Sequence, residues 1–392
     1  MAAKAAHATP LVAETLDPMF ECEQVSLRQA QVADLDALVA IEQRSFDTDL
    51  ISARSFKRFI QQQIGDFQVA VSAAGEVVGY YIVLYRHATN LARLYSLAVD
   101  PDYRRRGIGK QLLQAAEHDA DERHCLFMRL EVKLDNDAAQ ALYHHAQYFD
   151  MEIRAEYYED DSDALILQKF LPRYQPSGEH RLVPYLTQST DFTCGPASLL
   201  MAMAYFDIPS TDPSHEELEI WREATTIFMT SGHGGCGPHG LARAAVKRGM
   251  QVSLHVSTEG PLLLDSVRNE AKKQVMARIQ EADIAALKRA GVPIEVNDYG
   301  LQQLRADLAV GHLVVALIST YVFDNSKAPH WVMICAADDE YVYINDPDQD
   351  SFPWQSAAER QYLPIPHATF QRAFGFGARK QKAALVIHGK AI

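Results

Sequence analysis

The hydrophobic pattern of the first 172 residues alternates between helix-like and strand-like segments. Apolar residues recur at helical spacing over residues 34–44 and 55–64, which predicts two amphipathic helices. Apolar runs typical of strands lie at residues 25–30, 67–73, 77–85 and 91–99. A helix to about residue 122, a strand near 130–134, a helix carrying Tyr143 and a strand at 165–170 follow. Interspersed elements of this kind predict an α/β (α+β) domain.

A break that contains Pro, Gly and Ser, at residues 172–179, precedes a second set of elements. One helix is expected to begin at about residue 195 and another to end at residue 247. Two more helices are expected over residues 214–224 and 301–310. Strands are expected at 182–186, 250–255, 312–318, 330–336 and 341–345. Residues 264–290, rich in Ala, Lys, Glu, Gln and Arg, predict an inserted and partly exposed pair of helices.

The chain of 392 residues is long for one domain and comfortable for two. We therefore predict two α/β (α+β) domains. The expected divisions are a loose tail at 1–24, a first domain at 25–172, a linker at 173–180 and a second domain at 181–392 with a helical insertion at about 260–298.

Composition and charge narrow the classes of function. An apolar fraction of 48% and a charged fraction of 22% are ordinary for a globular protein. The formal net charge of -14 argues against non-specific nucleic-acid binding. No window holds 18 continuous apolar residues, so we expect no membrane span. The five cysteines are scattered without a CxxC pair, which argues against a disulfide framework and against a zinc site. The pattern favours a reducing, cytoplasmic location.

A basic, glycine-containing loop joins the strand at 91–99 to the following helix. It consists of Arg104, Arg105, Arg106, Gly107, Ile108, Gly109 and Lys110. Glycines let a backbone approach a ligand closely, and a helix N-terminus offers N–H groups to a phosphate. The loop therefore suits a cofactor that carries a pyrophosphate. The alternative is a helix start preceded by a solvated basic loop.

The next strand and helix strengthen the first interpretation, because they carry Glu131, Asn136 and Tyr143. Together with the loop, they make residues 25–171 resemble the GNAT acyl-CoA N-acetyltransferases, and among these the ribosomal-protein-alanine N-acetyltransferases. The resemblance implies a mixed central sheet and acetyl-CoA as co-substrate, without a metal. It also implies that Leu97 and Val99 pair with the pantetheine arm.

The same resemblance implies roles for three further residues. Asn136 would contact the cofactor, Glu131 would act as general base and Tyr143 as general acid. An amine must lose a proton to attack a thioester, and a carboxylate can accept it. The alternatives are that Glu131 is a surface strand residue and that Tyr143 is a core aromatic.

Two features nearby bear on the acceptor substrate. Gln147 stands where the family usually has a glycine with positive φ, so the chain is expected to leave the Tyr143 helix differently. The acidic run at residues 156–163 is expected to form a solvated hairpin loop, the alternative being a rim that attracts a cationic amine.

In the second half, Cys194 opens an apolar helix at Gly195-Pro196, and Gln188 lies six residues before it. A helix N-terminus favours a thiolate. With His330 and Asp346 downstream, this stretch resembles the papain-like cysteine peptidases that cut double-glycine leader peptides in bacteriocin export. The resemblance implies an N-terminal helix packed on an antiparallel sheet. It makes Cys194 the nucleophile, His330 its base, Asp346 the group that orients His330, and Gln188 an oxyanion donor.

Alternatives remain for this site as well. Cys194 could be a buried small apolar residue and His330 a core histidine. His233, Cys236 and His239 could be considered as metal ligands, although their spacing matches no common zinc pattern and favours a glycine-rich loop beside the site. We expect Cys335 to be a core residue.

The sequence as a whole predicts a bifunctional cytoplasmic protein, an N-acetyltransferase joined to a cysteine peptidase. The acceptor would be an α-amine of a peptide, a protein N-terminus or a small amine, and neither nucleic acid nor membrane is an expected partner. One alternative makes the second domain a peptide-binding module that presents substrate without cutting it. Another makes the first domain a sensor of acetyl-CoA.

Overall fold

The computed structural model describes residues 24–173, 183–225, 234–267, 269–324, 328–348, 357–377 and 379–391. The expected tail and linker lie almost entirely outside these ranges. The chain forms two compact units. The first unit comprises Met1–Ile82 and Ser96–Ala116, and the second comprises Val83–Tyr95 and Glu117–Ile392. The strands β3 and β4 run from one unit into the other.

The first unit contains the elements that the hydrophobic pattern predicted. They are β1 (Ser26–Gln29), α1 (Leu35–Ser45), α2 (Ala53–Gln62), β2 (Asp66–Val71), the first part of β3 (Val77–Tyr85), the second part of β4 (Leu91–Val99) and the start of α3 (Ile108–Glu122). The side chain of Ser52 caps α2 by accepting a hydrogen bond from the Ser55 N–H at 3.1 Å. The rings of Phe56, Phe67 and Tyr80 pack together in the core of this unit.

Gly79 on β3 permits a close approach between β3, β4 and α3. A Cβ at this position would lie 2.8 Å from the Ala98 carbonyl oxygen and 3.0 Å from the side chain of Leu112. Only a residue without a Cβ fits here, since the first of these distances is to backbone, which cannot move aside.

The remaining elements of the first sheet belong to the second unit. They are β5 (Phe127–Lys133), α4 (Asp137–His145), β6 (Phe149–Arg154) and β7 (Ala164–Phe170). The strand order is β1-β2-β3-β4-β5-β7-β6. The β4 and β5 strands pair in parallel, whereas β7 pairs antiparallel with β5 and β6, so the sheet is mixed as expected. The sequence analysis did not assign β6, although its residues FDMEIR alternate between apolar and polar, and the structure shows that this strand buries none of them.

Gln147 ends α4 in the left-handed conformation that its family position requires. Its φ is 70°. The N–H of Gln147 donates to His144 O at 2.9 Å and the N–H of Tyr148 to Tyr143 O at 3.0 Å, as in a helix ending that glycine usually forms. The backbone therefore forms the turn that glycine usually forms, and the Cβ of the glutamine makes this conformation sterically unfavourable.

We expect Gln147→Gly to stabilise the protein. Removing the Cβ relieves the left-handed strain, and after the entropy of glycine is subtracted the gain in free energy of unfolding is about 0.5–1 kcal/mol. Urea unfolding measures it. The matched control is Ala141→Gly in the middle of α4, which should lose about 1 kcal/mol. A loss in both variants would show that the turn is not strained.

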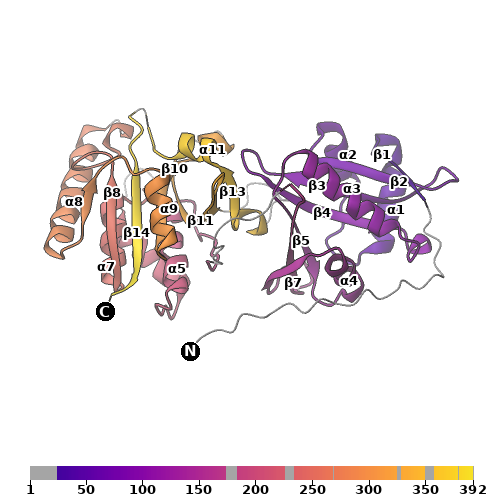
Figure 1. Ribbon diagram of the computed structural model, residues 1–392, viewed down its shortest axis with the longest axis horizontal. Helices are drawn as coiled ribbons and strands as arrows, with labels where there is room; N and C mark the ends of the chain where they lie inside the picture. Colours follow the sequence, from indigo (N-terminus) through magenta and orange to yellow (C-terminus); the bar gives the residue numbers. More distant parts are fainter. Residues whose placement is uncertain are drawn as a thin grey trace. The chain divides into compact units, whose positions relative to one another are not determined.

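The second unit also contains a second seven-stranded sheet, with the order β13-β12-β11-β10-β14-β8-β9. Its strands are β8 (Met250–Val256), β9 (Ile294–Val296), β10 (Leu313–Ser319), β11 (Pro329–Ala337), β12 (Tyr341–Asn345), β13 (Leu363–Pro366) and β14 (Ala383–Lys390). All neighbours pair antiparallel except β8 and β9. Figure 1 shows β8, β14, β10 and β11 side by side.

Two expectations for this sheet were wrong. Residues 183–186 form no strand, and residue 182 lies outside the described ranges. In addition, β12 is not the last strand of the sheet. The strand β14, from the end of the chain, lies between β10 and β8. Hydrophobicity marks β14 as apolar but does not show which strands it joins, because register and order depend on partners far away in sequence.

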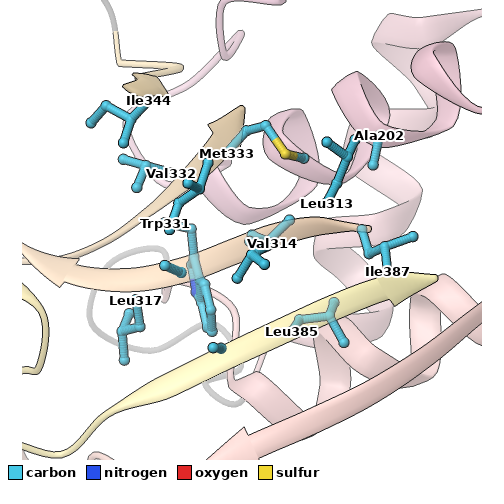
Figure 2. Close-up of a cluster of buried hydrophobic side chains, with 14 of the residues drawn as sticks. Ala202, Leu313, Val314, Leu317, Trp331, Val332, Met333, Ile344, Leu385 and Ile387 are labelled. Atoms are coloured by element: carbon cyan, nitrogen blue, oxygen red, sulfur yellow. The ribbon is translucent and has the colours of Figure 1, made fainter. Parts of the chain in front are cut away.

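The helices of this part are α5 (Cys194–Tyr205), α6 (Pro213–Ala224), α7 (Pro238–Lys247), α8 (Glu270–Arg289), α9 (Leu301–Ala309), α10 (Tyr321–Asp324) and α11 (His367–Ala373). The α5 helix packs on β10 and β11, and α7 packs on β8 and β14. Every residue of α5 from Cys194 to Met203 is buried. Figure 2 shows Ala202 of α5 beside buried side chains of β10, β11, β12 and β14. A helix that is apolar on all sides has to be central, and this one carries Cys194 at its start.

The predicted pair of inserted helices is a single long helix, α8, preceded by a short 3-10 turn at Leu264–Ser266. No glycine or proline interrupts residues 270–289, so nothing breaks the helix. The helix docks on α7 through buried polar residues. Gln280 accepts from the Leu262 N–H and donates to Leu262 O, both at 2.9 Å, and its Oε1 lies 3.3 Å from His239 Nδ1.

His239 should make the stability of the protein sensitive to acid. Burial lowers its pKa to about 4, against the hydrogen bond to Gln280. Above pH 6.5 the histidine is neutral in both the folded and the unfolded state. Between pH 6.5 and 4 only the unfolded state binds the proton, so folding loses about 3 kcal/mol as the pH falls across this window.

The measurement is urea unfolding at pH 7.5 and pH 4.5, with wild type and His239→Gln. We expect the difference in unfolding free energy between the two pH values to be smaller in the variant. His215, which is exposed on α6, provides the control His215→Gln, which should behave as wild type. Equal acid sensitivity in all three proteins would contradict the assignment.

Candidate active sites

Cys194 occupies the first position of α5 and is 6% exposed. Gly195 follows it where side chains pack closely around the helix start. A Cβ there would lie 3.2 Å from Trp331 and 3.4 Å from Cys236. The first turn of α5 presents free N–H groups and the positive end of the helix dipole to the site. The Trp331 N–H also points at Cys194 Sγ, 3.5 Å away.

His330 and Asp346 come from neighbouring strands of the second sheet. His330 is the second residue of β11 and Asp346 follows the last residue of the adjacent β12. His330 Nε2 lies 2.7 Å from Asp346 Oδ1. The Cys194 side chain also lies close enough to the imidazole to help raise the pKa of His330. The structure thus brings together the three residues that the sequence proposed.

Electrostatic interactions favour the charged forms of both His330 and Asp346. Burial opposes a proton on His330, but attraction by Asp346 and then by Cys194 outweighs it and raises the pKa of His330 well above its usual value. Burial likewise opposes charge on Asp346, yet His330 and then Arg86 hold the pKa of its carboxyl far below the usual range. The attraction to Asp346 therefore favours the imidazolium form of His330.

Gln188 lies beside this group, attached to the chain that follows Asp346. Its N–H donates to Pro347 O at 2.7 Å, and its side-chain Nε2 donates to Asp348 Oδ1 at 3.0 Å. A carboxamide nitrogen carries two hydrogens, so one contact does not consume its donor capacity.

Two arginines that the sequence analysis did not select complete the surroundings of Asp346. Arg86 Nη2 lies 2.5 Å and Arg360 Nη1 3.5 Å from Asp346 Oδ2. The Asp348 N–H donates to Asp346 Oδ1 at 3.1 Å. No local signal identifies Arg86, since it lies 260 positions from Asp346 in sequence.

In the first unit, the basic loop has the geometry of an anion-binding turn. Arg105 has φ 63° and Gly107 φ 77°, and α3 begins directly afterwards at Ile108. Arg104 and Arg106 donate to the carbonyl oxygens of Val99, at 3.2 Å, and Asp102, at 2.8 Å. The side chains of Arg104, Arg105, Arg106 and Lys110 are exposed. Positive charge, successive turned N–H groups and a 15-residue helix fit a pyrophosphate.

The β4 strand pairs with β5 over only part of its length. The parallel ladder consists of the pairs Leu91–Phe127, Ala92–Met128 and Arg93–Arg129, although β4 continues to Val99 and β5 to Lys133. Leu97 and Val99 lie in the continuing part of β4 and are half-buried.

In the second unit, Asn136 caps α4, because its Oδ1 accepts from the Ala139 N–H at 3.1 Å. Glu131 on β5 is not an exposed strand residue. Its Oε2 lies 2.9 Å from Arg93 Nε, and both side chains are less than a tenth exposed. Tyr143 is buried at 8% exposure with its ring against Tyr148. Burial raises the pKa of Tyr143, so its hydroxyl keeps its proton at neutral pH.

The acidic run before β7 has the features of a solvated hairpin loop. Its carboxylates at 156, 159, 160 and 161 are exposed. Asp160 pairs with Lys133 Nζ at 2.6 Å. The hydrogen bonds from Lys133 and then from Ser162 lower the pKa of Asp160 to about 2.

The metal-site alternative has no support among the described residues. These contain no cluster of three or more His, Cys, Asp or Glu side chains arranged for a metal. His239 bonds to Gln280, and His233 lies outside the described ranges. Cys236 lies next to the start of α5, where its carbonyl oxygen accepts from Trp331 Nε1 at 3.0 Å. Cys335 is buried in β11. Within the described ranges, no helix combines the length and apolar character that crossing a membrane requires.

Comparison with known proteins assigns both regions to families. Residues 183–388 match the Peptidase_C39 like family and residues 35–148 match the Acetyltransferase (GNAT) family. The [ribosomal protein bS18]-alanine N-acetyltransferase of Escherichia coli (strain K12) is 30% identical over 36% of this chain and 95% of its own length. An uncharacterised N-acetyltransferase of Methanocaldococcus jannaschii is 32% identical over 37% of this chain and 92% of its own.

A crystal structure of the Escherichia coli ribosomal-protein-S18-alanine N-acetyltransferase is 28% identical, covering 40% of this chain and 97% of that one, with a TM-score of 0.35. The chain belongs to the Peptidase_C39 like family through its C-terminal part and to the GNAT acetyltransferase family through its N-terminal part.

Proposed function

We propose that this N-acetyltransferase is bifunctional, acetylating an α-amine with acetyl-CoA and cleaving peptides with a papain-like cysteine site. The observation that carries the proposal is the His330–Asp346 ion pair next to Cys194 at the buried start of α5. A purely structural cysteine does not need a charged imidazole beside it. The buried charges are costly unless they serve a function or are fully paired.

In the peptidase reaction, the Cys194 sulfur attacks the peptide carbonyl carbon and forms a thioester. The departing amine takes its proton from the His330 imidazolium, and water then hydrolyses the thioester. Asp346 fixes the ring so that Nδ1 faces the sulfur and the amine. The Cys194 N–H and one hydrogen of the Gln188 carboxamide face the developing oxyanion.

For acetyl transfer, the loop from Arg104 to Lys110 is proposed to hold the pyrophosphate of acetyl-CoA, and Leu97 and Val99 its pantetheine arm. Glu131 accepts a proton from the acceptor amine, directly or through water, and Tyr143 protonates the departing thiolate. The exposed arginines of the loop support the first role, and the protonated Tyr143 hydroxyl supports the last.

The bS18-alanine N-acetyltransferases among the relatives support a peptide or protein N-terminus as the acceptor. A peptidase that exposes a new α-amine would supply this substrate. We further propose that the domain boundary falls at residues 173–180. The need for acetyl-CoA is consistent with a cytoplasmic location.

Mass spectrometry of a defined peptide mixture, incubated with and without acetyl-CoA, tests the peptidase. We expect cleavage by wild type, none by Cys194→Ala and at least about a hundredfold slower cleavage by Asp346→Asn, which loses the charge that orients His330. Cys125→Ala, a buried cysteine away from the site, is the control. Peptide that is retained by both wild type and Cys194→Ala without cleavage would instead support a binding module.

Release of coenzyme A with a peptide that begins with alanine tests the acetyltransferase. We expect Glu131→Gln and Tyr143→Phe each to lower kcat by about a hundredfold, in the range of general acid–base catalysis. Glu117→Gln, which removes a carboxylate paired with Lys169, is the control. Acetyl-CoA binding with unchanged turnover in both variants would contradict the proposed roles.

A further inference from the structure

One short segment of the second unit, Glu359–Gln361, contacts the surroundings of both candidate sites. The segment lies in the Peptidase_C39 like region, just before β13. Its partners Arg86, Arg93 and Arg129 lie in the acetyltransferase region. All of these residues belong to the same compact unit.

Arg86 links this segment to the cysteine site. Its Nη1 donates to the Glu359 carbonyl oxygen at 3.1 Å, and its Nη2 donates to Asp346 Oδ2 at 2.5 Å. The Arg360 carbonyl accepts from the Asp346 N–H at 2.8 Å. The planar fork of one guanidinium thus fixes the carboxylate against the backbone of the segment. The side chain of Arg86 is 17% exposed, so water screens the pair only weakly.

Arg93 links the same segment to Glu131. Its Nε donates to Glu131 Oε2 at 2.9 Å, while its Nη1 lies 3.5 Å from Glu359 Oε2. Each of the three side chains is less than a tenth exposed. One buried guanidinium is therefore divided between a proposed catalytic carboxylate of the acetyltransferase and a carboxylate of the peptidase-like region.

Further contacts hold the segment in place. Arg129 on β5 donates to the Gln361 carbonyl oxygen at 2.6 Å. The Phe127 ring, also on β5, lies 6.1 Å from Tyr343 and 6.5 Å from Tyr362, and the last two are stacked at 4.8 Å. The acetyltransferase strand and the peptidase-like sheet therefore meet in a packed apolar and polar contact rather than through a single ion pair.

We propose that each candidate site is completed by a positioning residue from the other family region. Arg86 of the acetyltransferase region holds Asp346, and Glu359 of the peptidase-like region holds Arg93 against Glu131. This inference rests on the proposed function, and it makes the two activities dependent on one docked arrangement. Neither residue touches the reacting atoms.

The first test measures alkylation of Cys194 by iodoacetamide across a pH series, located by mass spectrometry. Arg86→Met should slow alkylation by about tenfold, because Asp346 loses one of the cations that hold it and orients His330 less well. The acid limb of the profile should also move to higher pH, because Arg86 helps to keep Asp346 charged. Arg86→Lys retains the charge next to Asp346 and should recover most of the rate.

Arg173→Met is the matched control, since this arginine pairs with Asp121 and Glu122 instead. Urea unfolding of every variant identifies any that fail to fold. The inference is overturned if wild-type Cys194 reacts and folded Arg86→Met reacts equally fast at every pH. If wild-type Cys194 does not react at all, the proposed peptidase fails instead, and the Glu359 test decides the inference.

The second test measures coenzyme A release by Glu359→Gln with a peptide that begins with alanine. Without the Glu359 charge, Arg93 keeps its contact with the Tyr157 hydroxyl at 3.4 Å but pairs more strongly with Glu131, and so competes more strongly with the amine for this carboxylate. We expect kcat to fall about fivefold while KM for acetyl-CoA stays constant, with Glu219→Gln, paired with Arg222 on α6, as control. Unchanged kcat in an active wild-type background would overturn this half of the inference.

Discussion

The arrangement of the second unit depends on keeping a buried carboxylate charged. Asp346 is 7% exposed, and a carboxylate in such a place is unstable unless donors surround it. It receives them from His330, Arg86, Arg360 and the Asp348 N–H. These partners come from β11, from the end of β3 and from the chain after β12. Satisfying one charge therefore specifies how three distant parts of the sequence meet.

Further hydrogen bonds around Asp346 connect the segments that form the cysteine site. The Tyr185 hydroxyl donates to the Asp346 carbonyl at 3.0 Å, and the Asn345 carboxamide donates to Val183 O at 3.1 Å. The chain before α5 is thereby tied to the chain after β12. Cys194 and His330 lie on two regular elements, a wholly buried helix and an inner strand. Sites mounted on such elements hold their geometry better than sites on loops.

A second buried network lies at Arg93, and it has a different character. Here a cation is shared by two carboxylates, Glu131 and Glu359, whereas at Asp346 an anion is shared by cations. Both networks include residues of the Glu359–Gln361 segment. Removing one member of a buried charge network costs more free energy than the same ion pair would contribute in water. Each network therefore resists the separate movement of either region.

Local pattern was sufficient for most helices and strands, for the loop at Arg104–Lys110 and for Cys194, because periodicity and turn chemistry are properties of neighbouring residues. The sequence identified Gln147 at a position where glycine is usual, but the different exit expected from the Tyr143 helix was wrong, because Gln147 adopts the left-handed turn with φ 70°. Only tertiary structure decided that β14 lies between β10 and β8, that α8 docks on α7, and that Arg86 pairs with Asp346 and Glu359 with Arg93 of the other region. These outcomes depend on surfaces that meet across as many as 273 positions, and no local preference encodes such a meeting.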